Sequence, residues 1–157
     1  MDEQFARSLE RFGPVWQRVT ASSEPVEPRA SFGDGEQARL RLFLERETVL
    51  LSLYRALLRR TGNGAARRLL SDTQKHLRRL QLEFFLLTGD SLAIPPGREA
   101  PAGVLPLLRR AYLFEGELAE QYEAAANGPL QELYLDRAKA ARSHREALRG
   151  MIARALG

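Results

Sequence analysis

The two halves of this chain repeat each other. The 157 residues include only two histidines, His76 and His144, which lie 68 positions apart. The same offset aligns further identical residues: Glu47 with Glu115, Leu50 with Leu118, Tyr54 with Tyr122, Ala56 with Ala124 and Leu80 with Leu148. Each half therefore contains a Glu, a Tyr seven residues later and a His twenty-nine residues after the Glu. Because an internal repeat constrains the whole fold, we expect two copies of one structural unit.

The apolar residues of both halves recur every three or four positions, which predicts amphipathic helices. We expect four of them, over residues 35–60, 65–87, 103–126 and 130–156, with Asp34 as the N-cap of the first. Gly62-Asn63-Gly64 separates the first two helices and Asn127-Gly128-Pro129 the last two. Such short turns make antiparallel neighbours, so each half is predicted to be a helical hairpin.

Four polar residues interrupt the apolar stripes of these helices. Glu47, His76, Glu115 and His144 each occupy a stripe position, one on every predicted helix. A buried carboxylate without a partner is costly, so these side chains are expected to meet one another in the core.

Two segments without helical periodicity organise the rest of the chain. Residues 88–103 are rich in Pro and Gly and long enough to run the length of the bundle, since an extended chain covers about 3.3 Å per residue. Residues 20–35 form a second linker, and it follows a short amphipathic helix over residues 1–18. We therefore predict an N-terminal strap with its linker over residues 1–35 and a four-helix domain over residues 36–157.

Composition excludes several classes of site. The chain has no cysteine, which rules out disulfides, zinc–thiolate sites and iron–sulfur clusters. No run approaches the roughly 20 apolar residues of a membrane span, and the charged N-terminus does not resemble a signal peptide. A soluble cytoplasmic protein is the expectation.

The charge is carried almost entirely by arginine. The net charge is +4, and the arginines recur as pairs at Arg59-Arg60, Arg67-Arg68, Arg78-Arg79 and Arg109-Arg110. Nucleic-acid binding is one interpretation. Because the pairs are dispersed along the sequence among acidic residues, we favour solvated helix faces and do not expect a nucleic-acid partner.

The constellation over residues 36–156 resembles the ferritin-like superfamily, closest in style to rubrerythrin-type domains. In that family a Glu from the first and third helices and a Glu-x-x-His pair from the second and fourth hold two irons. Glu47 and Glu115 match the single glutamates, and His76 and His144 match the histidines. The resemblance implies an all-α, ferritin-like antiparallel four-helix bundle with a long crossover between its second and third helices.

The match lacks the glutamate of each Glu-x-x-His pair. Thr73 and Ala141 stand three residues before the histidines. The family's four carboxylates balance two divalent cations, whereas Glu47 and Glu115 balance one. A second ion would leave uncompensated positive charge in a low-dielectric core.

Three interpretations of the site follow. In the first, Glu47, His76, Glu115 and His144 hold a single ion such as Fe or Mn, with help from Asp72, whose counterpart in the other half is Ala140. In the second, the residues are metal-free and neutralise one another. In the third, a two-ion site recruits ligands from elsewhere in the chain.

The functions expected from these interpretations fall into two classes. One is a metal-binding protein with an oxidoreductase or peroxide-related role, in which Tyr54 and Tyr122 support the ligands. The alternative is a metal-free bundle that serves as a structural or protein-interaction module. A homodimer through the outer helix faces is compatible with both, and no membrane partner is expected.

Overall fold

The computed structural model describes residues 30–95, 97 and 103–157, with side chains described from residue 35 onward. The chain divides into two compact units, Met1–Asp34 and Gly35–Gly157. The predicted N-terminal strap, residues 1–18, lies outside the described residues, as does most of the linker after it. The second unit contains the whole predicted bundle.

Four helices make up the described part of the chain, and it contains no strand. They are α2 (Ala30–Thr61), α3 (Gly64–Thr88), α4 (Val104–Ala125) and α5 (Gln131–Leu156). The prediction of an all-α four-helix bundle is confirmed. The start of α2 was predicted wrongly, because helical backbone reaches back to Ala30 and Asp34 lies inside the helix. Glycines 33 and 35 weaken a helix by only about 1 kcal/mol each and do not stop it.

Both ends of α3 carry recognisable caps. Asn63 accepts a hydrogen bond from the backbone N–H of Ala65 at 2.7 Å and caps the start of α3. Gly62, between α2 and α3, has a φ of 60°. Gly89, just after α3, has a φ of 75° and donates its N–H to the Phe85 carbonyl. Both glycines occupy the left-handed conformation that other residues adopt at a cost.

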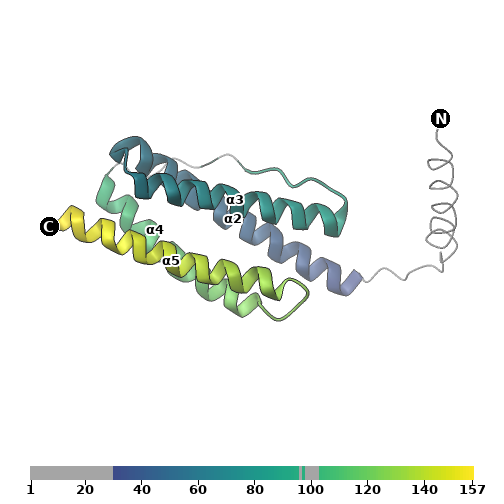
Figure 1. Ribbon diagram of the computed structural model, residues 1–157. Coiled ribbons are helices and arrows are strands. Elements are labelled where there is room, and N and C mark those ends of the chain that lie inside the picture. Colours follow the sequence, from purple (N-terminus) through teal and green to yellow (C-terminus); the bar gives the residue numbers. More distant parts are fainter. Residues whose placement is uncertain (1–29, 96, 98–102) are drawn as a thin grey trace, which may run out of the picture. The chain divides into compact units, whose positions relative to one another are not determined.

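The helices are arranged as two antiparallel hairpins, α2 with α3 and α4 with α5 (Figure 1). Helices α3 and α4 run in the same direction, so the segment between Gly89 and Gly103 has to return from one end of the bundle to the other. The side-chain amide of Gln81 donates a hydrogen bond to the Leu92 carbonyl at 3.0 Å, which fixes the first part of this return to α3. The predicted crossover topology is therefore present.

The core is formed by the apolar stripes of all four helices. Its largest fully buried side chains include Leu40, Phe43, Leu57, Leu80 and Leu107. Tyr54, Tyr122 and Tyr134 are also fully buried, and their hydroxyls need polar partners there. No helix in the described part of the chain combines the length and apolar character needed to cross a bilayer.

Candidate functional site

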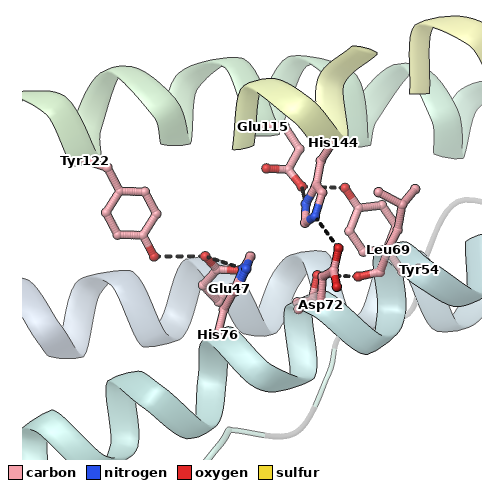
Figure 2. A network of polar contacts seen from close by, with 9 residues as sticks. Glu47, Tyr54, Leu69, Asp72, His76, Glu115, Tyr122 and His144 are labelled. Atoms are coloured by element: carbon pink, nitrogen blue, oxygen red, sulfur yellow. Dashed lines mark hydrogen bonds and ion pairs between the residues drawn. The ribbon is translucent and has the colours of Figure 1, made fainter. Parts of the chain in front are cut away.

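The four predicted site residues are buried and lie in one polar cluster in the middle of the bundle. Glu47, His76, Glu115 and His144 are between 1% and 7% exposed. They come from α2, α3, α4 and α5 respectively, one from each helix (Figure 2). The helical periodicity that placed them in the core is borne out.

Each tyrosine of the repeat binds the glutamate of the other half. The Tyr54 hydroxyl on α2 donates to Glu115 Oε1 on α4 at 2.6 Å, and the Tyr122 hydroxyl on α4 donates to Glu47 Oε1 on α2 at 2.8 Å. Adding 68 to one pair gives the other, because 54 becomes 122 and 47 becomes 115. Helices α2 and α4 are therefore related by an approximate two-fold axis, and the two bonds are equivalent under it.

Each histidine lies beside the glutamate of its own half. His144 Nδ1 is 2.9 Å from Glu115 Oε1, while His76 Nδ1 is 3.7 Å from Glu47 Oε1. The two imidazole rings stack with centroids 5.6 Å apart and planes 16° from parallel. The distance of 3.7 Å between His76 and Glu47 is within ion-pair range but too long for a hydrogen bond. The two halves therefore contain the same residues, but only the second half has a hydrogen bond between its histidine and its glutamate.

Asp72 makes the cluster asymmetric. Its Oδ2 lies 3.1 Å from His144 Nε2, so both ring nitrogens of His144 face carboxylates. The sequence placed Asp72 on α3 near His76, and the structure pairs it with the histidine of the other half instead (Figure 2). An ionised carboxylate only accepts hydrogen bonds, so the Asp72 contact requires a proton on Nε2. The Glu115 contact likewise needs one proton, carried either by Nδ1 of His144 or by the carboxyl group of Glu115.

The residues three positions before the two histidines contribute no polar group to this cluster. Thr73 is completely buried, and its hydroxyl donates to the Leu69 carbonyl one turn earlier at 2.8 Å. Ala141 is 2% exposed and carries no polar group. The described residues thus give the cluster two fully buried carboxylates, with Asp72 at its edge.

Burial raises the pKa of both central carboxyl groups. Desolvation brings the pKa of Glu47 from 4.5 to about 7, against the opposing effects of the Tyr122 hydrogen bond, His144 and Arg137. Desolvation also raises the pKa of Glu115, and its hydrogen bond with His144 works in the opposite direction. The pKa values of Tyr54 and Tyr122 rise well above 10 because of burial and the adjacent carboxylates. Both tyrosines therefore stay protonated and act as donors.

The neighbours of His144 favour the protonated form of its imidazole. Burial by itself lowers the pKa of His144, but the hydrogen bonds and charges of Glu115 and Asp72 outweigh it, so the pKa is raised overall. The raised pKa values of Glu115 and His144 both mean that this pair retains a proton more firmly than either group alone would in water.

Arg137 is a further member of the site that the sequence did not reveal. Its charge lowers the pKa of Glu47, and burial of its guanidinium lowers its own pKa. It lies two turns before His144 on α5, a spacing that places both side chains on the same side of the helix. That spacing was the available signal, but Arg137 has no counterpart in the first half, where the aligned residue is Leu69.

One carboxylate oxygen in the centre is unsatisfied. Glu47 Oε2 is buried and has no hydrogen-bond partner among the residues that the structure describes. Leaving a buried acceptor unpaired costs on the order of 1–3 kcal/mol, more when the group is charged. At the same time, no three His, Asp or Glu side chains in the described part of the chain are arranged to ligate one ion. The carboxylates and imidazoles instead pair with each other and with tyrosine hydroxyls.

Known proteins add no direct identification. No family model matches the chain, and no curated protein or solved structure is significantly similar to it.

Proposed function

We propose that this chain is a ferritin-like bundle that binds a single divalent transition-metal ion, Fe or Mn, at the buried cluster. Glu47, Glu115, His76 and His144 would be its ligands. Two carboxylates and two imidazoles are a donor set suited to these borderline ions. Tyr54 and Tyr122 would orient the carboxylates by donating to them.

The observation that carries this proposal is the unpaired Oε2 of Glu47. A buried carboxylate oxygen without a donor calls for a specific explanation, and a bound cation is one of the few available. Desolvation by burial raises the pKa of Glu47 to about 7, because the ionised carboxylate is poorly stabilised at this position. A divalent ion would satisfy the oxygen and hold the carboxyl ionised.

The charges around the site favour one ion over two. In a metal-bound state the imidazoles would be neutral and the carboxyl groups ionised. Glu47, Glu115 and Asp72 would then carry three negative charges and Arg137 one positive charge, which leaves two to be balanced. One divalent cation balances them. A second would add two charges in a medium where isolated charge is strongly disfavoured.

The Asp72–His144 contact supports the same interpretation. Metal-binding histidines commonly donate their second ring N–H to a carboxylate, which fixes the ring orientation and makes the ligand nitrogen more basic. Asp72 Oδ2 occupies that position on His144. An Fe or Mn ion at Nδ1 would supply exchangeable electrons for reaction with dioxygen or peroxide. The reducing equivalents would come from outside the chain, which has no cysteine.

Metal stoichiometry on untagged protein tests the proposal. Protein purified without chelator and loaded with Mn(II) or Fe(II) is expected to retain about one ion per chain. Replacing both histidines with alanine should abolish retention, whereas the exposed control Asp136→Asn should not change it. Because the chain has only two histidines, imidazole nitrogen coupled to Mn(II) in pulsed EPR would identify these ligands directly. Less than about 0.1 ion per chain after loading would rule the proposal out.

The direct pairing of the four side chains favours a second candidate, a metal-free structural or interaction module. Here the proton shared by Glu115 and His144 takes the place of the ion. In that case a chelator leaves the melting temperature unchanged, and Mn(II) does not raise it. Metal binding predicts the opposite, because a ligand that binds only the folded state stabilises it.

A further inference from the structure

The arginines that are dispersed in the sequence gather at one end of the bundle. This end consists of the last two turns of α2 and α5 and the first two turns of α3 and α4, on the left in Figure 1. We consider the eight residues of each helix that lie nearest this end. On α2 and α3 they include Arg55, Arg59, Arg60, Arg67 and Arg68. Those on α4 and α5 include Arg109, Arg110, Arg149 and Arg154. All nine arginines are exposed.

No acidic residue occurs in these four stretches. Residues 54–61, 64–71, 104–111 and 149–156 contain nine arginines and no Asp or Glu, a net charge of +9. At the opposite end, the corresponding stretches are residues 36–43, 81–88, 118–125 and 131–138. They contain six acidic residues and three arginines, so the net charge is −3. The bundle is therefore strongly polarised along its length.

The side chains alone produce this polarity. Two helices begin and two end at the arginine-rich end, so their terminal partial charges of about +0.5 and −0.5 cancel. The Cα atoms of the nine arginines lie within about 12 Å along the helix axes, given a rise of 1.5 Å per residue. That is close to one screening length of about 8–10 Å at physiological salt, so neighbouring groups act together on an anion.

The arrangement and type of these charges fit a nucleic-acid backbone. The arginines are set back by up to two turns on all four helices and surround the end as a collar. A flat surface would reach only the outermost of them, whereas a phosphate chain can follow the collar. Arginine presents a planar fork of N–H donors that matches phosphate oxygens. The four helical stretches that carry the collar contain no Asp or Glu.

We propose that this arginine collar binds the phosphate backbone of nucleic acid without sequence specificity. The collar lies at the end of the bundle and the Glu–His cluster in its middle, so binding does not depend on whether the cluster holds a metal. The arginine pairs are dispersed along the sequence, but in the assembled bundle nine arginines lie together at one end. Their dispersal in the sequence is therefore no argument against nucleic-acid binding.

Fluorescence anisotropy with a labelled DNA duplex of about 20 base pairs tests the proposal. The full chain is expected to bind at about 50 mM salt, with log affinity falling linearly as log salt rises. The double reversal Arg67→Glu/Arg68→Glu should weaken binding at least about tenfold and flatten the salt slope by about 2. Arg109→Gln/Arg110→Gln, a milder pair on α4, should weaken it in the same direction, by a smaller factor.

The matched control is Arg78→Glu/Arg79→Glu. It makes the same change in net charge on the same helix, also at exposed positions, but outside the collar. Its affinity should stay within about threefold of wild type, since only long-range charge is altered. If Arg67→Glu/Arg68→Glu and this control lose the same affinity for the duplex, net charge alone explains the effect. That result would overturn the proposal that the collar is the binding site. So would the absence of duplex binding at about 50 mM salt.

A second experiment tests whether this end binds a membrane surface, because apolar residues are exposed there too. Leu105 and Leu156 are exposed there and line a groove beside Arg109 and Arg110. The chain is mixed with phosphatidylcholine vesicles containing about one quarter phosphatidylglycerol and sedimented. Co-sedimentation by a chain that fails to bind the duplex would overturn the proposal in favour of an anionic membrane surface.

Discussion

The two halves of the buried cluster contain the same Glu, Tyr and His, yet their polar atoms are paired to different extents. In the second half, His144 contacts Glu115 at 2.9 Å and Asp72 at 3.1 Å. In the first half, His76 lies 3.7 Å from Glu47. Within the described part of the chain, the Oε2 of Glu47 has no hydrogen-bond partner. The histidine and glutamate are therefore hydrogen-bonded to each other in the second half and not in the first.

A single difference between the aligned residues accounts for part of this. Asp72 has Ala140 as its counterpart, so only one of the two histidines can receive a carboxylate at its second nitrogen. Arg137, aligned with Leu69, adds positive charge near Glu47 without hydrogen bonding to it. A duplicated framework can therefore hold two identical sets of groups in different hydrogen-bonding environments, because the neighbouring residues differ between the two halves.

The largest expected effect concerns the pH dependence of stability of the metal-free protein. Glu47 has a pKa of 4.5 when exposed and about 7 in the fold, so the folded state binds its proton more tightly. The stability due to this group is fully present below pH 4.5 and is lost as pH rises through about 7, by about 3 kcal/mol in total. Urea unfolding of wild type and Glu47→Gln in chelator should diverge over that interval, with wild type losing more. Parallel curves would contradict the raised pKa.

The next largest effect is a difference in stability between the two histidine variants. His144→Ala leaves Asp72 and Glu115 without their shared partner and should cost about 3 kcal/mol, because breaking a buried pair exposes the cost of the remaining charge. His76→Ala breaks only the 3.7 Å contact and should cost about half as much. Chemical denaturation at pH 6 measures both. Equal losses would mean that Asp72 does not distinguish the two sites.

Removing the tyrosine hydroxyls should cost less stability than removing the histidines. Here the larger loss is expected for the tyrosine that binds Glu47 of the first half. Tyr122→Phe removes the only hydrogen bond that Glu47 accepts from the described residues, and we expect a loss of about 2 kcal/mol. Tyr54→Phe leaves Glu115 bonded to His144, so about 1 kcal/mol is expected. Each is the other's control, since both remove one buried hydroxyl at equivalent positions. The same loss from both variants would show that the His144 contact does not compensate.

The smallest effects come from exchanging the residues that break the symmetry. Asp72 is 47% exposed in its side chain, so Asp72→Ala should cost no more than about 1 kcal/mol. Ala140→Asp places a carboxylate where the two-fold axis predicts a partner for His76 and should stabilise by a few tenths of a kcal/mol. Long-range ¹⁵N NMR of the two histidine rings would show whether His76 now resembles His144. An unchanged His76 spectrum would mean that the two-fold relation does not extend to this position.

The helices and the inward positions of Glu47, His76, Glu115 and His144 could be predicted from the sequence. Apolar periodicity depends only on residues three and four apart, and the glycines at 62 and 89 mark the ends of helices. The partners within the site could not be predicted in the same way. Tyr54 binds the glutamate sixty-one residues away, although Glu47 lies on its own helix. Asp72 reaches across to His144 rather than staying with His76.

The sequence by itself therefore determined that the chain forms amphipathic helices in two repeated hairpins, with the same polar groups buried in each. Only the tertiary structure decided which groups meet, because periodicity states which side of a helix is buried and not which helix covers it. Antiparallel packing of α2 against α4 produced the crosswise tyrosine–glutamate bonds. The same assembly brought four separate arginine-rich stretches to one end, since helix ends distant in sequence become neighbours when the hairpins pack.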